Sequence, residues 1–402
     1  MARNKKTRKK GAVLGSLILL LLIAAAAYLY LNYESEIREL LSRFTNGESS
    51  SESESASESE SASESESASE SENGGGETVV SGDVEVHFLE VGNKYTGDCT
   101  YIRVGDVDIL IDAGSRKSSA DTIGDYLDGY ITDGVIEYVI ATHAHQDHIA
   151  GFVGTKAAPG IFDRYECKTI IDFPRTEATS QIYQDYVSER DAEIAAGATH
   201  YTAAALIESG NAVIDLGDGV TMTVLDNYYY YHDASSENDY SVCILLSQGA
   251  LHYLFTGDLE EEGEEHLVAM NDLPEVALLK AGHHGSYTAT GEALLSVVKP
   301  KRVAVCCCAG STEYTDRMEN TFPSQEFCDR VAPYTREVYV TTVMTVDATG
   351  KEIGFTSMNG NIVVKGASGV VTVTCSASNT PLYLTAWFRE YRTCPPAWKD
   401  ED

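Results

Sequence analysis

The sequence predicts an α/β (α+β) fold with one large domain, preceded by one transmembrane helix. Three observations support this prediction. From Asp83 onward, short segments rich in β-branched residues alternate with helical segments. Polar clusters recur at the carboxyl ends of the predicted strands, where sheets covered by helices display their sites. A single long apolar run, near the N-terminus, carries no charge.

The N-terminal segment has the pattern of a membrane anchor. Residues 11–32 contain no charged side chain, and a helix of about 20 apolar residues spans a bilayer. Residues 1–10 contain six Lys or Arg side chains, which predicts a cytoplasmic N-terminus and an extracellular body. The alternative is a secreted protein whose signal peptide is cleaved near the small residues at 24–27. Either interpretation exports the body.

Residues 33–77 predict a short juxtamembrane segment followed by a flexible stalk. From residue 51 the chain repeats the unit SESESA. Alternating Ser and Glu cannot bury a core, and like charges keep such a segment extended. We therefore expect a solvated spacer without chemistry of its own.

The rest of the chain predicts a catalytic domain at 78–360 and a strand pair with an aromatic segment at 361–402. We expect the second part to belong to the same domain and to cover a sheet edge. Predicted strands lie at 84–92, 101–112, 136–141, 220–227, 240–258, 275–281 and 301–309, and predicted helices at 178–197, 259–270 and 291–299. Chemical clusters come from segments far apart in sequence, which favours one site.

The charge of the chain limits its partners. The protein has 62 acidic against 29 basic residues, and its formal net charge is −33. A body this acidic repels polyanions unless its cleft is locally positive. Nucleic acid is therefore a disfavoured substrate. The basic side chains nearest to the polar clusters form no dense stripe; they are Lys94, Arg116, Lys117, Lys280, Lys299, Lys301 and Arg302.

The central signal is the segment THAHQDHIAG. It places His143, His145, Asp147 and His148 within six residues, directly after a predicted buried strand. Imidazole and carboxylate groups are suitable zinc ligands. A lone histidine is usually structural, but this spacing is difficult to explain by packing. The segment therefore predicts a metal site.

These residues match the H-x-H-x-D-H signature, and the chain is identified on them as resembling the metallo-β-lactamase superfamily. Three further segments resemble its ComEC-like extracellular branch: FLEVGNKYTGDCTYIRVGDVDILIDAG, NDYSVCILLSQGALHYLFTGD and VALLKAGHHGSYTATGEALL. The resemblance covers about Val84 to Gly354. It implies an αββα four-layer sandwich, a metal-dependent hydrolase, and a location on the surface of a Gram-positive bacterium.

The resemblance also implies a set of metal ligands. His143 and His145 would hold a first metal, and Asp147 and His148 a second. Asp258 would bridge the two ions. One of the two adjacent histidines, His283 and His284, would complete the second site, and the sequence does not distinguish them.

Further site residues follow from the same resemblance. Asp147 and Asp98 are the candidate catalytic residues: Asp147 would orient the nucleophile, and Asp98 would orient either the nucleophile or a histidine of the site, unless it only forms a turn. Asn238 and Ser286 are the candidate substrate-binding residues. Asp112 is expected mainly to fix the loop that carries Gly114.

One departure from the superfamily affects the expected metal content. Many members supply a third histidine to the first metal, where this chain reads Asn-Asp-Tyr-Ser at 238–241. The site would then hold one or two Zn²⁺ ions, or a harder metal such as Mn²⁺. His200, His232 and Asp239 are candidate substitutes for the missing ligand.

Together these features predict a membrane-anchored extracellular hydrolase of phosphodiesters or phosphate esters that uses metal-activated hydroxide. One alternative is hydrolysis of a lactone, an amide or another small acyl compound. Another is a catalytically silent, zinc-stabilised surface domain that binds a partner. The sequence gives no indication of the oligomeric state.

Overall fold

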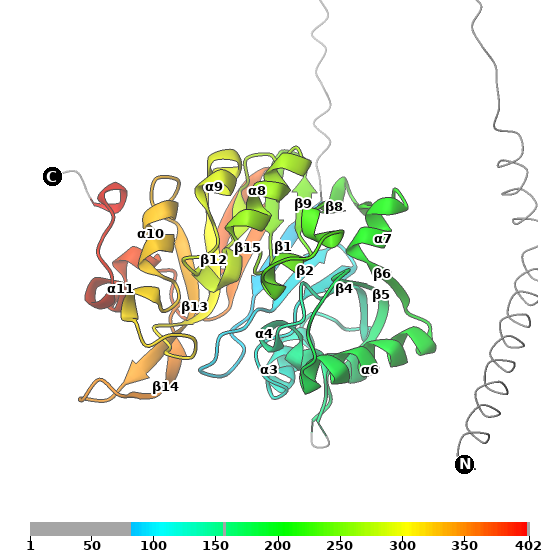
Figure 1. Cartoon of the computed structure of the whole chain (residues 1–402), viewed down its shortest axis with the longest axis horizontal. Coiled ribbons are helices and arrows are strands. Elements are labelled where there is room, and N and C mark those ends of the chain that lie inside the picture. The colour runs from blue at the N-terminus through cyan, green and yellow to red at the C-terminus, as the bar shows by residue number, and fades with distance from the viewer. Residues whose placement is uncertain (1–81, 156–157, 400–402) are drawn as a thin grey trace, which may run out of the picture. The chain divides into compact units, whose positions relative to one another are not determined.

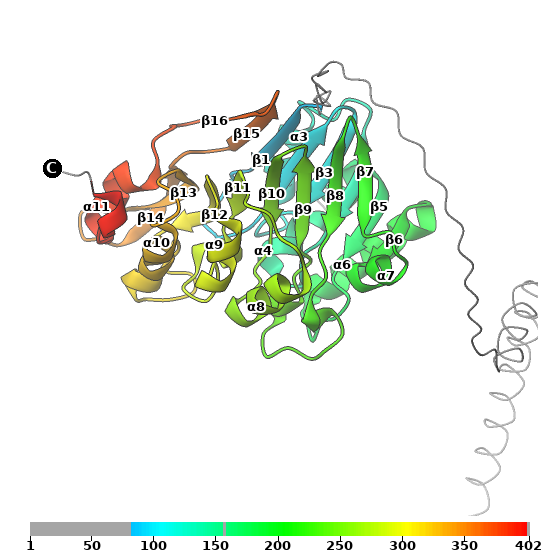
Figure 2. The same ribbon diagram turned by 90° about the horizontal axis from the view of Figure 1, so that it is seen from above.

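A computed structural model describes residues 82–155 and 158–399. Within these ranges the chain forms two eight-stranded sheets that face each other (Figures 1 and 2). The rings of Phe88 in the first sheet and Phe255 in the second lie 6.3 Å apart, centroid to centroid, across the space between the sheets. Helices cover the outer face of each sheet, so the αββα layering expected from the resemblance is present.

The first sheet has the order β16-β15-β1-β2-β3-β4-β5-β6. Strands β3 to β6 run parallel to one another, and the other pairs are antiparallel. Its strands are β1 (Val84–Phe88), β2 (Thr100–Val104), β3 (Val107–Ile111), β4 (Val135–Ile140), β5 (Glu166–Asp172), β6 (Thr199–Thr202), β15 (Ile362–Ala367) and β16 (Val370–Cys375). Strand β15 pairs with β1, which places the strand pair of 361–402 at this sheet's edge.

The second sheet has the order β14-β13-β12-β11-β10-β9-β8-β7. Strands β10 to β13 are parallel, and the flanking pairs are antiparallel. Its strands are β7 (Val213–Gly217), β8 (Val220–Val224), β9 (Ile244–Gln248), β10 (Leu251–Phe255), β11 (Leu278–Lys280), β12 (Val303–Ala309), β13 (Val338–Val346) and β14 (Glu352–Ser357).

Helices lie on both outer faces of the sandwich (Figure 1). Helices α3 (Ser119–Leu127), α4 (Gln146–Ile149), α5 (Ile161–Arg164) and α6 (Gln181–Ala196) accompany the first sheet, and α8 (Glu261–Met270), α9 (Glu292–Val298) and α10 (Gln325–Val331) the second. Two short helices, α7 (Ala203–Glu208) and α11 (Ala386–Tyr391), lie nearer the sheet ends.

Local sequence explains these elements. Strand β12 reads VAVCCCA with every residue buried, because parallel strands covered on both faces are apolar throughout. Strand β8 reads VTMTV and alternates between buried and half-buried residues, as expected where one face is covered. Helix α6 begins where the Ser180 side chain accepts a hydrogen bond from the Tyr183 N–H, and it ends at Gly197, whose φ is 125°.

Most of the elements expected from sequence are present, including the helices at 178–197, 259–270 and 291–299 as α6, α8 and α9. The α/β class is confirmed. Among the described residues, no helix is both long enough and apolar enough to cross a bilayer. The anchor expected at 11–32 and the stalk expected at 33–77 lie outside those residues and stay predictions.

Candidate metal centre

Four buried side chains converge where strands of both sheets end. Asp98 lies in the loop before β2, His148 in α4 after β4, Asp258 after β10, and His284 in the turn after β11. Each offers one ligand atom, and these atoms all lie within 4.8 Å of one another. The four residues are between 0% and 3% exposed. We refer to them as the four-residue cluster.

The contacts among His148, Asp258 and His284 fit a shared cation, while Oδ1 of Asp98 lies 3.0 Å from Nδ1 of His284. Oδ2 of Asp258 lies 3.1 Å from Nε2 of His148 and 3.1 Å from Nε2 of His284. Both nitrogens nevertheless lack a hydrogen bond of acceptable geometry, as does Oδ1 of Asp258. Buried polar atoms are normally hydrogen-bonded. Imidazole nitrogens and a carboxylate aimed at one small volume are the donor set that a divalent transition metal prefers.

Asp112 holds His148 in position. Its Oδ2 lies 2.7 Å from Nδ1 of His148, and its two oxygens also accept hydrogen bonds of 2.8 Å from the N–H and the hydroxyl of Thr142. A carboxylate on one ring nitrogen fixes the histidine tautomer and leaves the other nitrogen to face the cluster. The sequence assigned Asp112 mainly a loop-fixing role. Its strained backbone, with φ at 60°, has no clear sequence signal.

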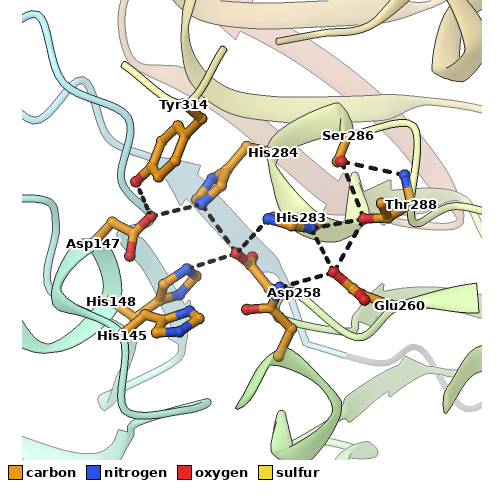
Figure 3. A network of polar contacts seen from close by, with 12 residues as sticks. His145, Asp147, His148, Asp258, Glu260, His283, His284, Ser286, Thr288 and Tyr314 are labelled. Carbon is orange, nitrogen blue, oxygen red and sulfur yellow. Dashed lines mark hydrogen bonds and ion pairs between the residues drawn. The ribbon is translucent and has the colours of Figure 1, made fainter. Parts of the chain in front are cut away.

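The two adjacent histidines have different surroundings. His284 is fully buried, and its Nδ1 lies 2.9 Å from the carbonyl oxygen of Cys306. Nε2 of His283 is 4.0 Å from Asp258, while its Nδ1 lies 2.9 Å from Oγ1 of Thr288. Both histidines adopt left-handed backbone conformations, and their rings lie 6.1 Å apart, centroid to centroid. His284 therefore joins the cluster, and His283 lies beside it (Figure 3).

A lysine supplies a positive charge beneath the cluster. Lys280 is 2% exposed and pairs with Asp98. Its Nζ is also 3.5 Å from Oδ1 of Asp258, and it donates a 3.1 Å hydrogen bond to the Gly257 carbonyl oxygen. Burial alone would lower the pKa of Lys280, but the two carboxylates outweigh it and raise that pKa. The ammonium group, with His148 and His284, overcomes desolvation and holds the pKa of Asp258 well below its usual value.

His143 and His145 form a neighbouring pair rather than part of the four-residue cluster. Nε2 of His143 lies 3.1 Å from Nδ1 of His145, and the His143 ring lies 4.1 Å from that of His148, centroid to centroid. His143 is fully buried, and burial holds its pKa well below the ordinary value. The pair is therefore close enough to contribute ligands to a second ion beside the cluster.

Asp147 lies near His148 and His284 (Figure 3). Its Oδ2 is 3.4 Å from Nε2 of His284 and accepts a 2.6 Å hydrogen bond from the hydroxyl of Tyr314. Desolvation opposes ionisation of this carboxyl, but the neighbouring histidines lower its pKa. Tyr314 is 167 positions away in sequence, so no local motif pointed to it.

The candidate substrate-binding residues are buried. Asn238 is 5% exposed, and its Nδ2 donates a 3.0 Å hydrogen bond to Glu260. Ser286 is 2% exposed, and its Oγ lies 3.1 Å from Oγ1 of Thr288. Both residues brace the loop around His283, and their contact with substrate stays a prediction.

The candidate substitutes for the missing ligand are engaged elsewhere. Nε2 of His200 lies 2.9 Å from Asp172, and the ring of His232 stacks on Tyr228 at 3.9 Å between centroids. Asp239 accepts a 3.1 Å hydrogen bond from the N–H of Glu260. Burial raises the pKa of Asp239 to about 6. None of the three belongs to the four-residue cluster.

A cavity of about 570 Å³ opens beside His145. Its lining mixes polar and apolar residues, includes two glutamates and contains no Lys or Arg; the residues are Ala144, His145, Gln146, Glu177, Ala178, Thr179, Ser180, Ile182, Ala234, Ser235, Ser236, Glu237 and Tyr240. A second cavity of about 610 Å³ shares Glu177 and Tyr240 with the first. A substrate of modest size fits a cavity of this volume.

Comparison with known proteins gives consistent matches. The family model described as "Metallo-beta-lactamase superfamily" matches residues 92–309. ComE operon protein 3 of Bacillus subtilis is 28% identical over 178 residues, which are 42% of this chain and 20% of that protein. Recombination protein 2 of Haemophilus influenzae is 40% identical over 65 residues, 16% of this chain and 8% of that protein. The chain thus spans a fifth or less of these relatives.

Solved structures of low sequence identity also match. The metallo-beta-lactamase fold protein YhfI from Bacillus subtilis is 11% identical, with a TM-score of 0.35, and the match covers 65% of this chain and 96% of that one. A probable metal-dependent hydrolase from Staphylococcus aureus is 16% identical, with a TM-score of 0.29, over 44% of this chain and 74% of that one.

Proposed function

Because this chain belongs to the metallo-beta-lactamase superfamily and has its metal-dependent hydrolase fold, we propose that it hydrolyses phosphodiesters or phosphate esters. The observation that carries the proposal is the convergence of Asp98, His148, Asp258 and His284, whose ligand atoms lie within 4.8 Å of one another. The resemblance to the ComEC-like branch, which ComE operon protein 3 supports, favours a phosphorus ester over an acyl substrate.

When bound, a divalent cation supplies Lewis acidity and lowers the pKa of a coordinated water. The chain's own residues prepare that chemistry. Asp112 keeps Nε2 of His148 directed at the cluster, and the Cys306 carbonyl does the same for His284. Lys280 offsets part of the negative charge of Asp98 and Asp258 before a cation arrives. Asp147 lies at the edge of the cluster and would orient the attacking group.

We propose Zn²⁺ as the metal, with Mn²⁺ as the alternative. Three of the expected second-site ligands, His148, Asp258 and His284, lie in the cluster. A second ion would depend on His143 and His145, because the candidate substitutes for a third ligand, His200, His232 and Asp239, are engaged elsewhere. These donors agree best with one ion bound in the four-residue cluster and a second ion bound more weakly at His143 and His145.

The charge of the cavity lining bears on the choice between a small substrate and a polynucleotide. A polynucleotide needs cationic side chains along its path, whereas the cavity beside His145 is lined by Glu177 and Glu237 and by no Lys or Arg. The adjoining cavity has two arginines, Arg175 and Arg190, and both are paired with carboxylates. The name of Recombination protein 2 refers to a process on DNA, which keeps nucleic acid among the substrates to test. We propose a small phosphodiester as the first choice.

The proposed location is the outer face of a cell membrane. The basic residues at 1–10, the apolar run at 11–32 and the Ser/Glu repeat support an anchored, exported enzyme. Protease protection of the N-terminus in intact cells, with digestion of the body, tests this orientation. Digestion of both ends or of neither would contradict it.

Turnover by the purified full-length chain tests the proposed activity. The substrates are bis-p-nitrophenyl phosphate, single-stranded and duplex DNA, and a lactone, each with zinc or manganese, beside Asp258→Asn. We expect phosphodiester turnover that the variant loses. Lactone turnover alone would replace the phosphodiester by an acyl substrate. Metal binding without turnover of any of these compounds would favour a catalytically silent binding domain.

A further inference from the structure

We propose that Tyr314 is a positioning residue for the carboxylate of Asp147, and that the loop at 311–320 exists in part to carry it there. The inference rests on the proposed function, since it assigns a role within the same centre. Its starting point is the 2.6 Å hydrogen bond from the Tyr314 hydroxyl to Oδ2 of Asp147 (Figure 3). A hydrogen bond to an ionised acceptor is strong and directional.

Hydrogen bonds hold the loop at 311–320 in place where its two ends meet and at Glu313. The N–H of Gly310 donates a 2.9 Å hydrogen bond to the carbonyl oxygen of Phe322, which closes the loop. Glu313 accepts hydrogen bonds from the Thr96 N–H at 2.9 Å and from the Arg116 guanidinium at 2.7 Å. The loop follows β12 of the second sheet, yet these partners belong to loops of the first sheet.

The fastening points adjoin the candidate ligands. Thr96 lies two residues before Asp98, so Glu313 fixes the loop that carries one cluster residue, while Tyr314 fixes Asp147. The Tyr314 ring also packs on Phe322 at 5.5 Å, and Phe322 lies 5.7 Å from the ring of His284, centroid to centroid. The loop therefore joins the ends of both sheets around the metal centre.

A purely packing role for Tyr314 fits the structure less well. The residue is 54% exposed, so its ring contributes little to the core. Its hydroxyl nevertheless reaches the carboxylate of Asp147, a residue that is only 8% exposed. Asp147 is one of the metal ligands that the superfamily signature implies, and an outer partner that orients a ligating carboxylate typically changes metal affinity or activity by about 10- to 100-fold. The hydroxyl, rather than the ring, is thus the group expected to matter.

The test compares zinc affinity of the full-length protein, by competition with a chromophoric chelator, with that of Tyr314→Phe, Glu313→Ala and the double variant. We expect Tyr314→Phe to weaken zinc binding by about 10- to 100-fold. Because Glu313 also holds the loop of Asp98 through Thr96, Glu313→Ala should weaken zinc binding on its own, and the double variant should bind zinc most weakly. Melting temperatures of the metal-free proteins should stay close to one another.

Tyr334→Phe is the matched control. Its hydroxyl donates a hydrogen bond of similar length, 2.7 Å, to the carboxylate of Glu292 at the surface, and we expect wild-type zinc affinity. Unchanged affinity in Tyr314→Phe or an equal loss in Tyr334→Phe would overturn the positioning role alone. If the wild-type protein binds neither zinc nor manganese, both the positioning role and the proposed function fail.

Discussion

Replacement of Lys280 by Met should change the stability of the metal-free protein and the affinity for zinc in opposite directions. The ammonium group is 2% exposed and pairs with Asp98 and, at 3.5 Å, with Asp258. Removing one partner of a buried ion pair leaves the others uncompensated and costs about 3–5 kcal/mol. The free energy of unfolding of the metal-free protein should fall by that amount.

Metal affinity should change in the opposite direction. At an effective dielectric constant of about 20, repulsion between an ammonium group and a divalent cation a few ångströms away amounts to several kcal/mol. Lys280→Met removes this repulsion and frees two carboxylates. Zinc binding should therefore tighten by at least about tenfold, which corresponds to ~1.4 kcal/mol.

Urea unfolding with and without zinc, combined with chelator competition, measures both quantities. The control is Lys301→Met, because Lys301 pairs with Glu275 at the surface, at 3.3 Å, and such pairs contribute less than about 1 kcal/mol. A Lys280→Met protein that is as stable as the control, or that binds zinc more weakly than wild type, would refute the reasoning.

Three further predictions concern other residues. Asp112→Asn should weaken zinc binding by about 10- to 100-fold, because its Oδ2 lies 2.7 Å from Nδ1 of His148; wild-type affinity in chelator competition would contradict this. Burial lowers the pKa of His87 to about 4, so the unfolded chain binds the extra proton and stability falls as pH drops from about 6.5 towards 4. Urea unfolding should show that the free energy of unfolding falls by about 3 kcal/mol over this range in the wild type, and that this loss is absent in His87→Phe. The same dependence of stability on pH in both proteins would argue against it. Gly97→Ala should weaken zinc binding, because a Cβ there would lie 2.5 Å from Cβ of Ser115 and displace the adjoining loop; unchanged binding would show that the loop adapts.

The sequence predicted the fold class and the core of the site because both depend on local patterns. The strand-then-histidine segment at 136–148 forms β4 and α4, and Asp258 follows β10 as expected. The membership of the superfamily is confirmed by the family model. The α/β class and the histidine cluster need only periodicity and close spacing, which a single chain displays directly, whereas the superfamily and the place of Asp258 came from the resemblance of motifs.

Other parts of the centre depend on three-dimensional contacts. The choice between His283 and His284 is decided by left-handed backbone conformations that no propensity indicates. Lys280 was one of several basic residues in the sequence, and only its place in the otherwise apolar segment VALLKAG hinted at burial. Tyr314 approaches from a loop far along the chain, so its contact with Asp147 had no sequence signal.

The most direct test of the account is the metal content of the purified full-length protein, measured by elemental analysis after growth with zinc and manganese, beside Asp258→Asn. We predict at least one equivalent of a divalent transition metal in the wild type and a large loss in the variant, whose replaced oxygen faces both His148 and His284 at 3.1 Å. A wild-type protein without bound metal, or a variant that retains it fully, would contradict the assignment of this cluster as the metal centre.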